Sequence, residues 1–138
     1  FSCGIFQRWY LCSLILRIMS HRLFYLLLVF ACSSAVYAQS LTISSSGNSG
    51  SYSYSSGTLT ISGTANIQAT QIQTWLTSSS LTILGNTNAI SVNINENIIS
   101  STAGNGLTIG NSNSTGTVTF NNTVNLMGVL TVYAEKIK

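Results

Sequence analysis

The sequence contains no proline, and only 5% of its 138 residues are charged. An ordinary soluble domain carries about 25% charged residues. So few charges exclude a coiled coil, an electrostatically steered nucleic-acid binder and a highly charged disordered tail. The length limits the chain to one domain.

The basic residues and the cysteines are concentrated near the N-terminus. All three arginines, the histidine and all three cysteines precede residue 38. From Gln39 onward, the charged side chains are Glu96, Glu135, Lys136 and Lys138. The formal net charge of +3 therefore comes from the leader. The remainder offers no basic patch for phosphate contacts, so we expect no nucleic-acid partner.

Residues 19–38 are typical of a secretory signal peptide. Residues 19–22 form a short basic n-region, residues 23–32 an apolar h-region, and Val36 and Ala38 occupy the −3 and −1 positions of a cleavage site. We expect cleavage after Ala38, a secreted or cell-surface protein and no stable membrane span after cleavage. An uncleaved anchor is the alternative, although the apolar run is shorter than the roughly 20 residues of a span. Residues 1–18 are interpreted as upstream sequence or a mistaken gene start.

The segment after Ala38 has few side chains that perform chemistry. It contains no His, Cys, Asp or Arg, and therefore lacks the usual general base, thiol nucleophile and metal-binding cluster. Its two carboxylates, Glu96 and Glu135, lie far apart in the sequence and do not indicate a glycosidase pair. We expect no catalytic residue, no metal site, no cofactor and no enzyme activity.

One tripeptide, Leu-Thr-Ile or Leu-Thr-Val, occurs five times between residues 41 and 132. Each copy alternates apolar, polar and apolar residues, as half-buried strands do. Further alternating runs cover residues 89–95 and 117–120, and Gly-rich or Asn-rich turns lie between, including the Ser/Gly/Tyr-rich segment 47–57. Recurrence every 20 to 25 or so residues is typical of solenoid proteins.

We therefore predict an all-β fold, a right-handed parallel β-solenoid of about four to five irregular coils after an N-terminal hydrophobic signal helix. An antiparallel β-sandwich is the alternative. Residues 39–138 form the β-repeat domain, and asparagines at the turns are expected to form amide ladders. The expected core residues are Leu41, Leu59, Leu81, Leu107, Leu130, Ile43, Ile61, Ile83, Ile109 and Val132. The expected outward ladder is Thr42, Thr60, Thr82, Thr108 and Thr131.

One segment departs from the strand pattern. Between residues 69 and 78, Ile72, Trp75 and Leu76 have helical spacing, and Thr70 is the expected N-cap. The pattern predicts a short helical turn that lays Trp75 over an edge of the solenoid. There Trp75 would pack as a cap or stack on a ligand.

The layout of residues 57–134 resembles the β-strand repeats of large secreted bacterial adhesins, the filamentous-haemagglutinin-like and autotransporter passenger proteins. The resemblance lies in the Leu-Thr-Ile/Val repeats and in residues 89–93 and 116–122. It implies export, a right-handed parallel β-helix and cell adhesion. The Asn-Pro-Asn signatures of that family are absent, and its members are usually far longer. We therefore expect a fragment, truncated at the C-terminus.

Two functions fit this sequence. The first is a structural or adhesive module whose Thr, Ser and Asn faces bind surface glycans or matrix through many polar contacts, with self-association through open solenoid ends. The alternative is an ice-binding solenoid, in which a flat outward Thr ladder matches a water lattice. The spacing between the repeated leucines, which varies from 18 to 26 residues, counts against the second function.

Overall fold

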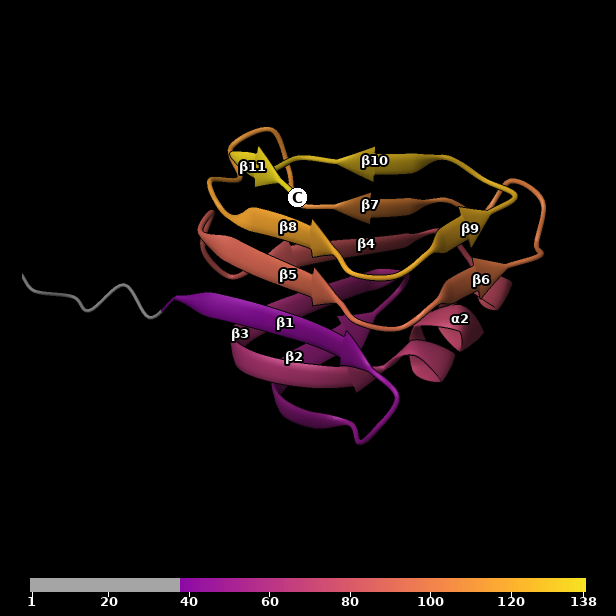
Figure 1. The fold of residues 1–138 in the computed structure, drawn as a ribbon, viewed down its shortest axis with the longest axis horizontal. Helices are drawn as coiled ribbons and strands as arrows, with labels where there is room; N and C mark the ends of the chain where they lie inside the picture. Colours follow the sequence, from indigo (N-terminus) through magenta and orange to yellow (C-terminus); the bar gives the residue numbers. More distant parts are fainter. Residues whose placement is uncertain (1–37) are drawn as a thin grey trace, which may run out of the picture. The chain divides into compact units, whose positions relative to one another are not determined.

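The computed structural model describes residues 38–138, which form a mostly β structure with one helix (Figure 1). The predicted signal peptide before Ala38, its helix and residues 1–18 lie outside the described residues. In chain order, the elements are β1 (Gln39–Ser44), β2 (Ser49–Ser55), β3 (Thr58–Gln68), α2 (Ala69–Ser78), β4 (Leu81–Gly85), β5 (Ile90–Ile94), β6 (Ile98–Ser100), β7 (Leu107–Ile109), β8 (Thr117–Phe120), β9 (Val124–Leu126), β10 (Leu130–Val132) and β11 (Lys136–Ile137).

Most of the strands belong to one curled, largely parallel sheet. Its order is β10-β7-β4-β3-β1-β5-β8-β11, and β2 pairs with β3. The sheet curls into a half-barrel, so that β4, β7 and β10 lie across the core from β5 and β8 (Figure 1). Strands β6 and β9 form a separate parallel pair. The antiparallel sandwich is therefore wrong, because every strand pair except β2–β3 is parallel.

The long strand β3 connects the two halves of the curled sheet. Its first half pairs with β4, where Thr58 lies beside Thr82, and its second half pairs with β1, where Thr64 lies beside Ser40. Gly63 lies between the two halves, and a glycine inside a strand commonly marks a sharp bend. One strand therefore takes part in both walls of the half-barrel.

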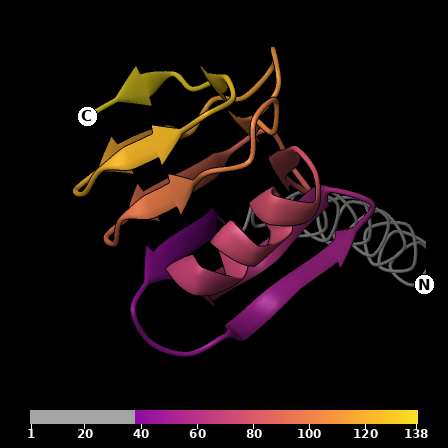
Figure 2. The same cartoon turned by 90° about the vertical axis from the view of Figure 1, so that its right-hand side faces the viewer.

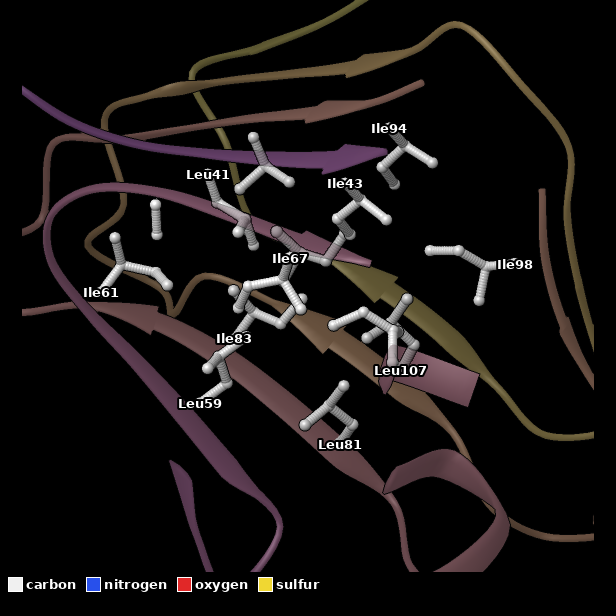
Figure 3. Packing of buried hydrophobic residues seen from close by; sticks show 14 of the residues in the cluster. Leu41, Ile43, Leu59, Ile61, Ile67, Leu81, Ile83, Ile94, Ile98 and Leu107 are labelled. Atoms are coloured by element: carbon white, nitrogen blue, oxygen red, sulfur yellow. The ribbon is translucent and has the colours of Figure 1, made fainter. Parts of the chain in front are cut away.

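The core lies inside the curl and is made of isoleucine, leucine and valine side chains from alternating strand positions (Figure 3). Burial of each such side chain contributes about 1.5–3 kcal/mol. Since the described chain has no cysteine, no disulfide adds to this packing. The fully buried residues include Leu41, Ile43, Leu59, Ile61, Ile67, Ile83, Ile94, Ile98 and Leu107.

The helix and the β2 strand cover the core beside β1 and β3 (Figure 2). The helix was predicted over the residues that form it, and it buries Ile72 and Leu76. The N-cap prediction is wrong. Strand β3 runs directly into the helix, so Gln68 is the N-cap residue and Thr70 is already helical, and no side chain caps the first turn.

The segment predicted as a Ser/Gly/Tyr-rich turn contains strand β2, which pairs antiparallel with β3. Its tyrosines alternate with serines, and Tyr52 and Tyr54 pack against the core. Only the ends of the segment form the turns that its glycines indicate, at Gly47 and Gly57, which both have positive φ.

Candidate functional site: two polar faces of the curled sheet

Three of the five Leu-Thr-Ile/Val repeats stack in register. Strand β7 lies between β4 and β10, so that Thr108 is beside both Thr82 and Thr131. Their leucines align in the same way, with Leu107 beside Leu81 and Leu130. This alignment places the three threonines in one outward row, because the flanking apolar residues of β4 and β7 are buried.

The repeat in β3 joins this stack with a shift of two residues. Thr58 lies beside Thr82, whereas Thr60, the predicted ladder member, lies beside Leu84, and Leu59 lies beside Ile83 rather than Leu81. A shift of two residues keeps every side chain on the same side of a sheet. Leu59 and Ile61 therefore remain buried, as expected, although their neighbours differ from those predicted. We call Thr58, Thr82, Thr108 and Thr131 the Thr ladder face.

The first repeat does not join that stack at all. Strand β1 lies between β3 and β5, where Thr42 is beside Asn66 and Asn93. Leu41 and Ile43 are buried, but their neighbours come from β3 and β5 rather than from the other repeats. The tripeptide pattern specifies which side chains face the core, and it does not specify which strand lies alongside.

The last repeat lies at the edge of the stack. Leu130, predicted as core, is 39% exposed, and Val132 is half-buried. Both side chains face the same way as the buried residues of β7 beside them. Their exposure arises because, among the described strands, β10 pairs with β7 alone.

The structure also shows a second and wider polar face, on the outward side of β1, β5, β8 and the second half of β3. The printed registers place Ser40 beside Thr64 and Ser91, and Asn93 beside Thr119. Two outward polar side chains therefore project from each of four neighbouring strands, which lie about 4.8 Å apart. We call this set the Ser/Thr/Asn face; its rows are Thr64, Ser40, Ser91 and Thr117, and Asn66, Thr42, Asn93 and Thr119.

This face is not among the features predicted from the sequence. The alternation in residues 89–95 and 117–120 already marks Ser91, Asn93, Thr117 and Thr119 as outward. The sequence does not indicate that β1 and β3 extend the sheet of β5 and β8. Strands β1 and β3 contain the Leu-Thr-Ile repeat and β5 does not, so the pattern groups β1 and β3 with the other repeats. Only Thr42 of the predicted ladder belongs to this face.

Two side-chain hydrogen bonds on the Ser/Thr/Asn face join β1 to the second half of β3. The Ser44 hydroxyl donates to the Asn66 side-chain oxygen at 2.7 Å, and the Ser40 hydroxyl donates to that of Thr64 at 3.4 Å. Within the described residues, no side-chain hydrogen bond involves Ser91 or Thr119. Their hydroxyl groups are therefore available to a ligand.

An amide ladder, as predicted, stands at the turn that follows β5 and β8. The Asn121 side-chain amide donates to the Asn95 side-chain oxygen at 2.7 Å, and the Asn122 amide donates to the Asn95 carbonyl at 2.6 Å. The next residue along the turn, Thr123, donates its backbone N–H to the Asn97 side-chain oxygen at 3.2 Å. These contacts fix successive turns against each other.

The aromatic and ionisable residues form no reactive cluster in residues 38–138. Trp75 is half-buried and stacks on Tyr54. No group of three His, Cys, Asp or Glu side chains there could hold a metal ion. The same part of the chain has no helix with the length and apolarity that a membrane crossing requires.

The candidate functional surface of the described chain therefore consists of two uncharged polar faces. A scan against protein-family models found no match. Searches of curated proteins and of solved structures found no match either.

Proposed function

We propose that residues 39–138 form a short right-handed parallel β-solenoid. Support comes from the stacking of every third strand: β4 with β7 and β10, β5 with β8 and β11, and β6 with β9. Each turn of the chain would then contribute one strand to each of three sides. Parallel strand connections are right-handed in about 98% of cases, which favours that hand.

We propose further that this solenoid is a structural and adhesive module, and that its Ser/Thr/Asn face binds polyhydroxylated polymers such as surface glycans or matrix polysaccharides. The observation that carries the proposal is the pair of outward polar rows on four parallel strands. Hydroxyl and amide groups both donate and accept hydrogen bonds, as sugar hydroxyls do. Each contact contributes only about 0.5–1.5 kcal/mol, so useful affinity requires many contacts along a polymer.

We propose export through the signal peptide, with cleavage after Ala38. Strand β1 begins at Gln39, the residue that this cleavage would leave first. Gln39 is only 3% exposed, and its side-chain oxygen accepts a hydrogen bond from the Thr87 backbone at 3.0 Å. A cleavage site directly before the first strand is consistent with a folded domain on the cell surface or in the medium, as in bacterial adhesins.

Co-sedimentation with insoluble polysaccharides tests the binding face. The variant Thr117→Val/Thr119→Val removes two hydroxyls from the Ser/Thr/Asn face and keeps side-chain shape and β-branching. The matched control, Thr82→Val/Thr108→Val, makes the same change on the Thr ladder face. We expect the first variant to lose binding and the control to retain it. Equal binding by both variants would contradict the assignment of this face.

Ice binding is the second candidate, and one observation favours it. The Ser/Thr/Asn face carries two outward polar side chains per strand. On the Thr ladder face, the second outward position of β4, beside Thr60, is the apolar Leu84. Thermal hysteresis and shaped ice crystals, both reduced by Thr117→Val/Thr119→Val, would establish ice binding instead of glycan adhesion. Unshaped crystals would exclude it.

A further inference from the structure

The turn that precedes β7 contains the one Asn-Gly pair of the sequence, Asn105-Gly106. Asn105 is half-buried, and its side-chain amide donates to the Leu76 carbonyl at 2.7 Å and to the Thr77 carbonyl at 3.4 Å. Both carbonyls belong to the last turn of α2, where carbonyl groups have no partner within the helix. Asn105 therefore caps the end of α2 from a distant part of the chain.

The glycine of the pair is held at the same place. The Gly106 N–H donates to the Ser80 hydroxyl at 3.1 Å, and the Gly106 carbonyl accepts from the Leu81 N–H at 2.9 Å. The next turn of the chain packs closely on this peptide, because a Cβ atom at Gly128 would collide with the Asn105 carbonyl. The Asn-Gly pair is therefore enclosed between the end of α2 and the turn at Gly128.

An asparagine followed by glycine is especially prone to deamidation, because glycine has no side chain that hinders its nitrogen. The Gly106 nitrogen loses its proton and attacks Cγ of Asn105. A C–N bond forms, and the side-chain nitrogen leaves as ammonia. Water then opens the five-membered imide at one of its two carbonyls. The product is aspartate, or isoaspartate, in which the main chain runs through the former side chain.

The fold opposes this attack. The Asn105 amide would have to leave the carbonyl groups of the helix, and the Gly106 N–H would have to leave the Ser80 hydroxyl. These contacts join the same two segments, so the reaction requires local opening of the turn. Its rate therefore follows the fraction of molecules in which the turn is open.

The product does not fit the closed turn. A carboxylate accepts hydrogen bonds and donates none, so it cannot replace the amide at the Leu76 and Thr77 carbonyls. Its negative charge would also lie at the negative end of the α2 dipole. Isoaspartate adds a main-chain atom beside Gly128, where there is no room even for a Cβ atom.

We propose that Asn105 is a modification site whose deamidation is gated by the fold. The reaction proceeds when the turn before β7 opens, and its product then prevents the turn from closing on α2. Prolonged opening or unfolding of the chain thereby becomes irreversible. Asn105 is thus the position at which the chain records its own unfolding.

A second Asn-Gly pair in an exposed turn provides the matched control. Asn88 is an exposed turn residue, and Ala89→Gly places a glycine directly after it. The full chain with Ala89→Gly is incubated in buffer and in urea at the same pH and temperature. Peptide mass spectrometry follows the conversion of Asn88 and Asn105 in both samples.

We expect Asn88 and Asn105 to react at similar rates in urea, because the dipeptide is the same. In buffer, Asn105 should react about tenfold or more slowly than Asn88, because it must wait for local opening. A reaction at Asn105 in buffer as fast as at Asn88, or faster, would overturn the gating by the fold.

The effect of the product is measured with Asn105→Asp, and Asn88→Asp is its matched control. We expect Asn105→Asp to lower the urea midpoint or to prevent folding, because it places a carboxylate at the helix carbonyls. Asn88→Asp should leave the midpoint unchanged. Equal midpoints for the two variants would overturn the inference. Neither experiment depends on glycan binding or on cleavage of the signal peptide.

Discussion

The ring of Tyr54 stacks on the ring of Trp75 with centroids 4.2 Å apart and an interplanar angle of 11°. Tyr54 comes from β2 and Trp75 from α2, so the contact joins the two elements that cover one side of the core. Both side chains also pack against the buried cluster. The aromatic pair therefore closes the part of the core that no further parallel strand covers.

Loss of this pair should destabilise the fold without affecting the polar faces. We expect Trp75→Ala to lower the free energy of unfolding by about 2 kcal/mol, less than for a fully buried tryptophan because Trp75 is half-buried. A double-mutant cycle with Tyr54→Ala in urea should give a coupling energy of about 0.5–1.5 kcal/mol. Strictly additive effects of the two substitutions would show that the stacking contributes nothing.

Leu81, Leu107 and Leu130 form a row of inward leucines across β4, β7 and β10. An aspartate at an interior leucine of this row should prevent folding, whereas an aspartate at the edge leucine should not. Leu107 is fully buried, whereas Leu130, its neighbour in the same row, is 39% exposed. Leu107→Asp should cost about 4 kcal/mol or more, because it combines a lost leucine with an unpaired buried charge. The same substitution at Leu81 should behave alike, and Leu130→Asp is the matched control.

Circular dichroism and urea unfolding measure both outcomes. We expect Leu107→Asp and Leu81→Asp to lose the β spectrum, and Leu130→Asp to retain it with a smaller loss of stability. If Leu107→Asp were as stable as the parent, the inward position of this residue would be wrong.

The asparagine ladder should contribute modestly to stability. Asn121→Ala removes the 2.7 Å hydrogen bond to the Asn95 side-chain oxygen, and we expect a loss of about 1 kcal/mol. Asn88→Ala is the control, because Asn88 is an exposed turn residue whose backbone carbonyl accepts the hydrogen bonds from Ile90 and Thr115. Its loss should stay within about 0.5 kcal/mol. Equal midpoints of thermal unfolding for the two variants would argue against the ladder.

Gly116 lies where one turn of the chain passes close to the preceding one. A Cβ atom at this position would collide with the backbone carbonyl of Ile90. We expect Gly116→Ala to cost about 3 kcal/mol or to prevent folding, since backbone must move. At Gly104, a Cβ atom meets nothing within 4 Å and only the positive φ of 84° opposes substitution. Gly104→Ala should therefore cost about 1–2 kcal/mol, and a larger loss there than at Gly116 would contradict the close approach.

Alternation in the sequence was sufficient to predict which side chains face the core. Leu41, Leu59, Leu81 and Leu107 are all buried, although only two of them lie beside each other in the predicted row. The period of two residues is a local property that the sequence displays directly. Which strands become neighbours depends on the path of the whole chain, and here β1 lies beside β5 and the second half of β3 instead of beside the repeat in the first half of β3.

Two strands and one face could not be predicted in the same way. Strand β2 is polar apart from its tyrosines. The alternation of Tyr52 and Tyr54 with serines is a strand pattern, but it lies in a segment whose glycines and serines predict a turn. Strand β11 has only two residues and is recognisable through its pairing with β8. The Ser/Thr/Asn face needs β1 to lie beside β5, which no local pattern indicates.

The position of β1 is the central structural claim, because it creates the Ser/Thr/Asn face. Nuclear Overhauser contacts between backbone protons of an isotope-labelled chain measure it directly. The structure predicts contacts from Thr42 to the strands of Asn93 and Asn66, together with contacts between Thr82 and Thr108. Contacts that place Thr42 beside Thr60 in a single five-membered ladder would contradict it.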